Sequence, residues 1–272
     1  MTINCLGNLI DLSVPKIMGI LNATPNSFYD GGKYANENSI LLQVEKMLTE
    51  GASFIDIGAY SSKPSAEFVS EEEEINRLLP VLKMVLREFP QTLISVDTFR
   101  AKVAKAAVEN GACIINDIAA GNLDENMMET VAGLQVPYIM MHMRGTPQSM
   151  QSLTEYDNIT RDMLFYFSEK VALARSFGIN DIIVDPGFGF AKTVEQNFEV
   201  LGNLELFQSL ELPVLVGVSR KSMIYKTLNT SAEFALNGTS VLNTIALQKG
   251  ADILRVHDVK EAVECIKLVS QL

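Results

Sequence analysis

The sequence has 272 residues, of which 47% are hydrophobic and 20% are charged, and its formal net charge is −11 at pH 7. These values exclude a disordered or collagen-like chain and allow a large hydrophobic core. The strong negative charge argues against nonspecific binding to nucleic acid or to an anionic membrane, because both depend on neutralising phosphate groups.

Neither a membrane segment nor a disulfide framework is expected. No apolar run approaches the roughly 20 residues that cross a bilayer, and no secretory signal pattern is present, so we expect a cytoplasmic protein. The three cysteines, Cys5, Cys113 and Cys265, are odd in number and widely spaced, which supports neither disulfides nor a zinc site. No linker divides the chain, so we predict one domain over residues 1–272 with a short N-terminal lead-in at 1–15.

Eight short apolar runs follow one another along the chain, and nearly every one is closed or followed by polar side chains. The runs are 17–21, 54–57, 93–96, 113–115, 138–141, 182–184, 214–218 and 253–256. Continuously apolar runs are typical of strands that are buried on both faces of a parallel sheet.

Segments with helical spacing separate these runs. In the segment 70–87, Ser70 and Glu73 form a capping-box pattern, and we interpret the four glutamates at 71–74 as a solvated first turn. A glycine precedes several of the runs, as expected where a helix ends in the left-handed conformation; these are Gly51, Gly111, Gly178 and Gly250. Eight alternating units predict a single (β/α)₈ barrel rather than an open doubly wound sheet, with extended loops after strands 1 and 2.

The polar residues at the strand ends should meet at the mouth of such a barrel, where the chemistry of this fold is placed. They are Asn22, Asp56, Asp97, Asn116, Asp117, His142, Asp185, Ser219 to Lys221, Arg255 and His257. Buried carboxylates need a donor from a ligand, a metal or a cation, and Lys221, Arg255 and Lys63 are the available cations. An ion-pair network at the rim is the structural alternative. We interpret His142 as a structural rim histidine, and Asp56 as a loop-anchoring or metal-side carboxylate.

Three segments add chemical detail. The loops at 22–33 and 59–66 are long and combine aromatic, hydroxyl and cationic residues, which favours substrate-covering loops. The segment 185–190 (DPGFGF) lets backbone approach a flat ligand beside Phe190. Arg255 and His257 share one side of the last strand, an arrangement that suits a diphosphate. A serine nucleophile elbow, an HExxH helix, a Walker A loop and a dinucleotide fingerprint are all missing from the sequence.

Taken together, the motifs closely resemble those of the dihydropteroate synthase family. The matching segments are 18–25 (MGILNATP), 56–58 (DIG), 95–98 (SVDT), 115–117 (IND), 141–143 (MHM), 185–190 (DPGFGF), 217–221 (GVSRK) and 255–258 (RVHD). The resemblance implies a TIM barrel that joins (7,8-dihydropterin-6-yl)methyl diphosphate to p-aminobenzoate with Mg²⁺ and releases diphosphate. The expected displacement is dissociative, which means that diphosphate leaves before the amine attacks.

The resemblance also implies roles for individual residues. Asp97 and Lys221 would be catalytic, and the pterin would be bound by Asp97, Asn116, Asp185, Phe190, Gly217, Lys221 and Arg255. The diphosphate would meet Asn22, Ser62, Arg255 and His257, with Asn22 also at the metal. The p-aminobenzoate would be surrounded by Phe28, Ser62, Lys63, Pro64, Phe190, Lys221 and Ser222. A homodimer through the helices around 237–246, and inhibition by sulfonamides, are further implications.

The second loop departs from the family pattern, which is usually GESTRPG. Here residues 59–65 read AYSSKPS, with Lys63 in place of arginine and Ser65 in place of glycine. Because lysine cannot reproduce the bidentate fork of arginine, we expect weaker binding of p-aminobenzoate and of sulfonamides. Two other functions are alternatives to that of a dihydropteroate synthase: a pterin-binding methyltransferase barrel and a non-catalytic pterin-binding homologue.

Overall fold

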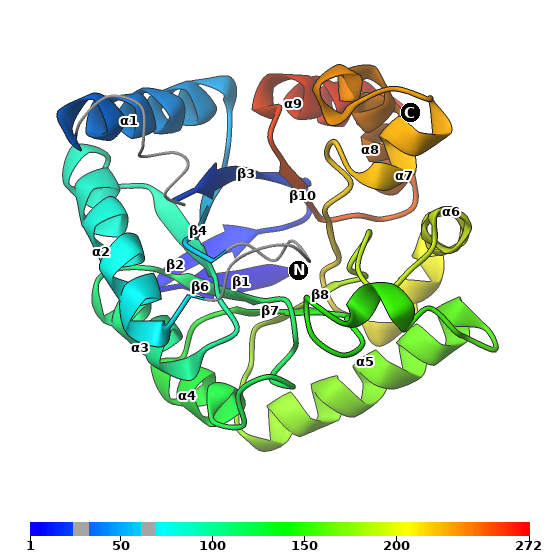
Figure 1. Cartoon of the computed structure of the whole chain (residues 1–272), viewed down its shortest axis with the longest axis horizontal. Coiled ribbons are helices and arrows are strands. Elements are labelled where there is room, and N and C mark those ends of the chain that lie inside the picture. Colours follow the sequence, from blue (N-terminus) through cyan, green and yellow to red (C-terminus); the bar gives the residue numbers. More distant parts are fainter. Residues whose placement is uncertain (24–32, 61–68) are drawn as a thin grey trace.

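The computed structural model describes residues 1–23, 33–60 and 69–272 and shows a ring of strands surrounded by helices (Figure 1). The strands are β1 (Thr2–Cys5), β2 (Asn8–Asp11), β3 (Lys16–Asn22), β4 (Phe54–Gly58), β5 (Leu93–Asp97), β6 (Ile114–Asp117), β7 (Tyr138–Met141), β8 (Ile182–Asp185), β9 (Leu215–Val216) and β10 (Ile253–Val256). The helices are α1 (Lys33–Glu50), α2 (Glu71–Glu88), α3 (Ala101–Glu109), α4 (Met127–Leu134), α5 (Ile159–Ser176), α6 (Val194–Gly202), α7 (Ser222–Thr227), α8 (Leu236–Gln248) and α9 (Val259–Val269).

The main sheet closes into the predicted barrel. Its eight strands run in the order β8-β7-β6-β5-β4-β3-β10-β9, and every pairing is parallel. A parallel bridge between Val184 and Val214 joins the two ends of this order. The loops that were expected to be long after the first two barrel strands include residues 24–32 and 61–68, which lie outside the described residues.

Alternation along the strands sorts side chains into two cores. One set of strand residues packs against the helices, and it includes Ile17, Ile55, Ile94 and Ile115. The neighbouring positions form a second, smaller cluster inside the ring: Met18, Phe54, Ile114, Ile139, Ile183, Leu215 and Ile253. Successive strand residues point to opposite faces of a sheet, so the residues two positions further along each strand also face the interior.

The N-terminal lead-in is a hairpin that closes one end of the barrel. Strands β1 and β2 pair antiparallel, and Ile3 and Cys5 join the interior cluster. The backbone N–H of Asn4 donates to Asp181 Oδ2 at 3.0 Å, which ties the hairpin to the segment before β8. The amino ends of the barrel strands are therefore covered by apolar side chains.

Two strand predictions need correction. The run at 214–218 gives a strand of only two residues, β9, because Gly217 and the residues after it turn toward α7. The run at 113–115 is displaced, since β6 begins at Ile114 and continues through Asn116 to Asp117. The glycine predictions are confirmed, because Gly51, Gly111, Gly178 and Gly250 all have positive φ angles between 90° and 109°.

The prediction that the four glutamates of the first turn of α2 are solvated is wrong for Glu74. Ser70 caps the helix by accepting from the backbone N–H of Glu73 at 3.2 Å. Glu74, however, is buried and accepts hydrogen bonds from Thr98 Oγ1 and Arg100 Nη1, each at 2.8 Å. Burial raises the pKa of Glu74, while these two donors act to lower it. The fourth glutamate of the run thus fastens α2 to the segment after β5.

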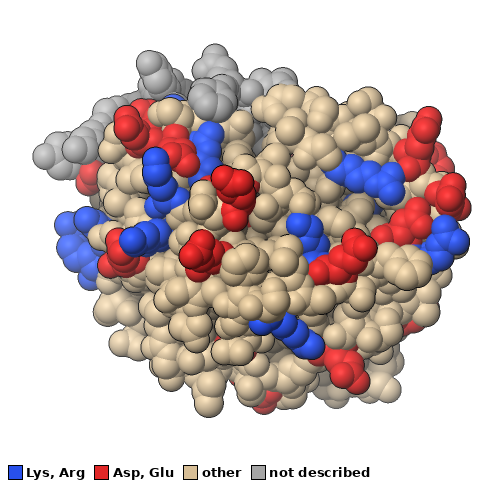
Figure 2. Space-filling view, turned by 90° about the horizontal axis from the view of Figure 1, so that it is seen from below, with Lys and Arg blue, Asp and Glu red and all other residues tan. Residues whose placement is uncertain are grey.

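The lengths of the helices and the charges on the surface are relevant to whether the protein binds membranes or nucleic acid. Within the described ranges, every helix is too short or too polar to span a bilayer. On the face shown in Figure 2, lysine and arginine side chains are scattered among aspartate and glutamate side chains. Such interspersed charge does not form the continuous basic stripe that nucleic-acid binding uses.

The closing hairpin should contribute measurably to stability. Replacing Ile3, which is 2% exposed, with alanine leaves a cavity in the interior cluster. We expect Ile3→Ala to lower the free energy of unfolding by about 2–4 kcal/mol in urea denaturation. Leu9→Ala is the matched control because Leu9 lies in the same hairpin and is 73% exposed. Equal midpoints for the two variants would contradict a packed closure.

Candidate functional site

A polar layer lies inside the barrel, directly above the apolar interior cluster. Two residues beyond Phe54, Ile114, Ile183 and Ile253 come Asp56, Asn116, Asp185 and Arg255. The strand register sets Asp97 beside Asn116 and Asp56 beside Ser95. The same alternation that fills the lower barrel with apolar groups therefore brings these polar groups together.

Arg255 is the centre of this layer. Its Nε donates to Asp56 Oδ2 at 2.6 Å and its Nη2 donates to Asp97 Oδ2 at 2.8 Å. Asn116 Nδ2 donates to the same Asp56 oxygen at 3.1 Å. Burial raises the pKa of Asp97 to about 7, whereas the charge of Arg255 opposes this change. One guanidinium thus holds carboxylates from two neighbouring strands.

The described partners of Asp56 all lie inside the barrel. Its carboxylate is fully buried within β4 and binds Arg255 and Asn116, so it positions barrel residues rather than a loop. Sequence reasoning had no signal for this, because Arg255 lies 199 residues away. In the described part of the chain, Asp56 Oδ1 and Ser95 Oγ are buried and have no hydrogen-bond partner. The layer therefore keeps hydrogen-bonding capacity beyond its internal contacts.

Lys221 and Asp185 are two further charged residues of the site, and the charge of each affects the pKa of the other. Burial lowers the pKa of Lys221 to about 8, and the charge of Asp185 opposes this shift. Burial also raises the pKa of Asp185, opposed by Lys221 and by the backbone N–H of Gly187, which donates to Asp185 Oδ1 at 2.7 Å. A Cβ placed on Gly217 would lie 3.8 Å from both Lys221 Nζ and the Cβ of Arg255, so Gly217 lies between the two cations.

The loop after β8 covers the stem of Lys221. Lys221 Nζ donates to the backbone carbonyl of Phe188 and lies 5.0 Å from the centre of the Phe190 ring. Gly187 and Gly189 have φ angles of +67° and +83°, which a residue with a Cβ rarely adopts. The backbone of this segment therefore follows a path that favours glycine at both positions.

Other predicted residues lie at the rim. His257 is exposed, and its Nδ1 is 3.0 Å from Ser219 Oγ. Asn22 ends β3 and is exposed, and Ser222 begins α7 directly after Lys221. The predicted residues Phe28, Ser62, Lys63 and Pro64, together with Ser65, lie outside the described residues.

His142 was interpreted as a structural rim histidine; it is buried, and sequence reasoning missed its partner. The imidazole is buried, its Nδ1 is 3.1 Å from Lys192 Nζ, and burial lowers its pKa well below the usual range. Lys192 is itself buried. A lysine after an apolar loop usually predicts a solvated side chain, so the sequence offered no reason to place it inside.

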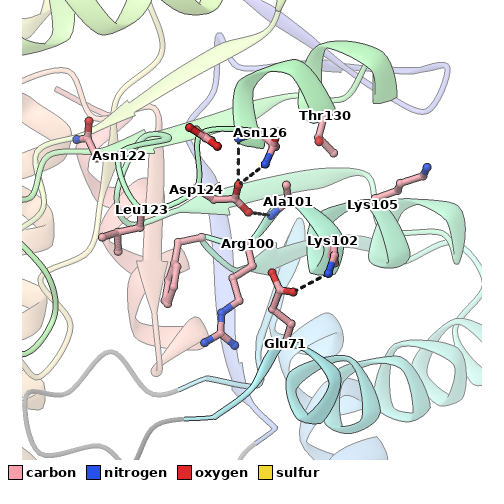
Figure 3. A pocket seen from close by; sticks show the side chains of 12 residues that line it. Glu71, Arg100, Ala101, Lys102, Lys105, Asn122, Leu123, Asp124, Asn126 and Thr130 are labelled. Atoms are coloured by element: carbon pink, nitrogen blue, oxygen red, sulfur yellow. Dashed lines mark hydrogen bonds and ion pairs between the residues drawn. The ribbon is translucent and has the colours of Figure 1, made fainter.

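A cavity of about 900 Å³ lies apart from this layer, between α3 and the loop before α4 (Figure 3). Among its charged lining residues, Lys102 Nζ is 3.2 Å from Glu71, and Asp124 accepts from the backbone N–H groups of Ala101 and Asn126. Among the described residues, the buried polar atoms without a partner include Asp56 Oδ1 and Ser95 Oγ of the barrel layer and none of this cavity's lining, so the polar layer is the stronger candidate for a functional site.

The side chains available as ligands limit the kind of metal site that this barrel can form. Among the residues that the structure describes, no three His, Cys, Asp or Glu side chains converge to hold a metal ion. Mg²⁺ is often bound through one or two protein oxygens and the oxygens of a phosphate substrate. The amide oxygen of Asn22 fits a metal of that kind, which arrives with its anion.

Comparisons with known proteins agree with this geometry. The sequence model of the pterin binding enzyme family matches residues 18–257. Dihydropteroate synthase from Haemophilus influenzae is 44% identical over 261 residues, covering 95% of this chain and 94% of that protein. The Yersinia pestis dihydropteroate synthase, solved as a sulfonamide drug complex, has a TM-score of 0.93 at 40% identity over 100% of this chain and 98% of that one. The Xanthomonas albilineans enzyme in complex with 7,8-dihydropteroate has a TM-score of 0.89 at 33% identity, covering 100% and 98%.

The glycine loop after β8 offers a sharp test of the site geometry. A Cβ on Gly187 would lie 2.3 Å from the backbone oxygen of His142, and the φ angle of Gly187 is +67°. We expect Gly187→Ala to lower the free energy of unfolding by about 2–3 kcal/mol, measured by urea denaturation.

The control is Gly133→Ala within α4, where a Cβ would meet no atom within 4 Å. That change should leave stability unchanged or raise it by about 0.5–1 kcal/mol. A Gly187→Ala protein as stable as this control would show that the loop does not require a glycine.

Proposed function

The chain belongs to the dihydropteroate synthase family of pterin-binding enzymes, and we propose that it joins (7,8-dihydropterin-6-yl)methyl diphosphate to p-aminobenzoate. The products are 7,8-dihydropteroate and diphosphate, and the reaction is a transferase step of folate synthesis. The observation that carries this proposal is the polar layer inside the barrel, where carboxylates, an amide and two cations surround the mouth.

The polar layer supports recognition of a pterin ring. A pterin edge presents adjacent N–H donors and acceptors, which match a carboxylate such as Asp185 and an amide such as Asn116. Asp97 and Lys221 complete the set of groups that we assign to the ring, with Gly217 leaving room between the cations. The ring would lie between Phe190 and the planar guanidinium of Arg255, because both offer flat surfaces.

The chemistry is a displacement at the pterin methylene carbon. The C–O bond to diphosphate breaks, the amine nitrogen of p-aminobenzoate forms the new C–N bond, and the proton released from that nitrogen passes to water or to diphosphate. An arylamine is neutral at pH 7, so no strong general base is required. If diphosphate leaves first, positive charge develops on the methylene group, and the carboxylate of Asp97 stabilises it. The ion pair with Arg255 supports this role by favouring ionised Asp97.

Charge neutralisation at the rim would assist the leaving group. We assign the diphosphate to Asn22, Ser62, Arg255 and His257, and we assign Mg²⁺ to Asn22. A bound Mg²⁺ would supply positive charge against the phosphate oxygens. The exposure of His257 and Asn22 at neighbouring strand ends fits a substrate group that stays near solvent.

The p-aminobenzoate would lie between the mouth and the first two loops. We assign it to Phe28, Ser62, Lys63, Pro64, Phe190, Lys221 and Ser222. Support within the described residues comes from Phe190 and Lys221, which contact each other across the loop after β8, and from Ser222, which follows Lys221 at the start of α7.

The proposal is tested by diphosphate release. Purified protein is mixed with the pterin diphosphate, Mg²⁺ and p-aminobenzoate, and each component is omitted in turn. We expect release only in the complete mixture, and Asp97→Asn should lose most of it because the charge opposite the methylene group is removed. A wild-type chain that releases no diphosphate under any of these conditions would instead be a non-catalytic pterin binder.

The lysine of the second loop should weaken recognition of p-aminobenzoate. Restoring a bidentate fork with Lys63→Arg is expected to lower the Michaelis constant for p-aminobenzoate, and the inhibition constant of a sulfonamide, by roughly twofold to tenfold. Steady-state kinetics measure both. Lys46→Arg, on the surface of α1, is the control and should change neither constant. Identical constants for Lys63→Arg and wild type would contradict the proposal.

We also propose a homodimer through the helices around residues 237–246, which lie in α8. Val241 on α8 is 51% exposed, and Leu228 and Phe234, in the segment between α7 and α8, are 53% and 70% exposed. A cytoplasmic location is proposed as well, supported by three cysteines that are all buried free thiols.

The dimer proposal predicts a specific change in mass. Val241→Glu places a charge in the apolar surface and should give a monomer in light scattering. Phe165→Glu is the control, since Phe165 is similarly exposed but lies on α5. A wild-type protein that is already monomeric at micromolar concentration would refute the dimer.

A further inference from the structure

A buried lysine lies under the loop after β8, outside the chemistry described above. Lys192 is 5% exposed, and its Nζ lies 3.0 Å from the carbonyl oxygens of Gly187 and Phe190 and 3.1 Å from His142 Nδ1. An ammonium group has three N–H bonds, so each has one acceptor here. A buried cation with a complete set of acceptors has a structural role, unlike a lysine whose amine is solvated.

The acceptors hold the two ends of one short turn. The backbone N–H of Phe190 donates to Gly187 O at 3.1 Å, and Lys192 Nζ binds the carbonyls of both residues. Between them, Phe188 offers its carbonyl to Lys221 Nζ. A Cβ on Gly189 would lie 3.4 Å from the Cδ of Lys221, so the turn also touches the stem of that lysine. Lys192 and Lys221 therefore hold the same turn through different carbonyls.

The third acceptor connects the turn to a rigid part of the barrel. The backbone N–H of His142 donates to Asp185 O at 2.9 Å, and its ring packs edge-on against Tyr166 at 4.9 Å between centroids. Because the His142 side chain is buried and its pKa is well below the usual range, Nδ1 is free to accept from Lys192. The imidazole thus fixes Lys192 relative to strands β7 and β8.

The surrounding charges are compatible with this arrangement. Burial lowers the pKa of Lys192 to about 7; Asp185 opposes this change, while Lys221 and Arg144 add to it. If the amine loses its proton, it can still donate to both carbonyls and accept from a protonated His142 Nδ1. The bonds to the turn are therefore maintained in either protonation state.

We infer that Lys192 is a positioning residue, which acts through the turn 187–190 to place Phe190 and Lys221 for binding of the pterin substrate. The inference rests on the proposed function for its ligand. It does not make Lys192 a catalytic residue, because its amine is fully engaged with the turn and with His142.

The test compares two variants with a control. Lys192→Met keeps a similar volume and removes all three donors, and Lys192→Gln retains an amide with two N–H bonds. Lys170→Met is the control, because Lys170 is a half-buried lysine of α5 whose Nζ donates to Asn122 rather than to the turn. Each protein is examined by hydrogen exchange of the segment 183–193 without ligand, by pterin diphosphate titration, and by steady-state kinetics.

Lys192→Met should lose exchange protection in 183–193 and bind the pterin diphosphate at least about tenfold more weakly, as expected from losing several buried hydrogen bonds. The turnover number at saturation should fall less than the affinity does. Lys192→Gln should show values between those of wild type and Lys192→Met. If Lys192→Met does not fold, the same three measurements on Lys192→Gln test the inference. The control should match wild type.

Two results would overturn the inference: wild-type exchange protection in Lys192→Met, or lost protection with unchanged pterin affinity. Failure of the proposed function is distinguishable, since the wild-type chain would then release no diphosphate from the complete reaction mixture. Loop protection, which needs no ligand, would still report whether Lys192 holds the turn.

Discussion

A guanidinium held inside a closed ring of strands is the interaction on which the site depends. Arg255 comes from β10, and its two carboxylate partners come from β4 and β5, so the contact spans the interior of the barrel. Asp56 is fully buried, and a buried carboxylate that loses its partner costs about 3–5 kcal/mol. The position of Asn116 follows from the same carboxylate, because its amide donates to the oxygen that Arg255 binds.

The barrel interior consists of two layers with different roles. The lower layer, which includes Met18, Phe54 and Ile253, is apolar and completed by the hairpin, so it stabilises the fold without any ligand. The upper layer is the polar layer, whose charged side chains are partly shielded from water. Its remaining hydrogen bonds would be made by a bound ligand. Ligand binding should for this reason raise the stability of the whole barrel, by an amount set by ligand concentration and affinity.

The barrel and most of its inward-facing polar residues could be predicted from the sequence, because strand alternation and helix-ending glycines are local patterns. What could not be predicted depends on partners far apart in the chain. Glu74 reads as a solvated residue until Arg100, 26 residues later, is placed beside it. Of the three groups that Lys192 Nζ contacts, two carbonyls are local, but the third, His142 Nδ1 at 3.1 Å, comes from 50 residues earlier. The brevity of β9 likewise reflects the turn toward Lys221 rather than its apolar composition.

The hairpin of β1 and β2 restricts the route by which ligands enter and leave the barrel. Because Ile3 and Cys5 fill the amino end of the barrel, reactants and products share the opposite opening. A molecule that reaches the polar layer must enter before anything that binds nearer the rim, and the condensed product must depart along the path by which its precursors came. Any compound lodged at that opening would therefore obstruct arrival and departure alike, so retention of the product could itself limit the rate of the next cycle.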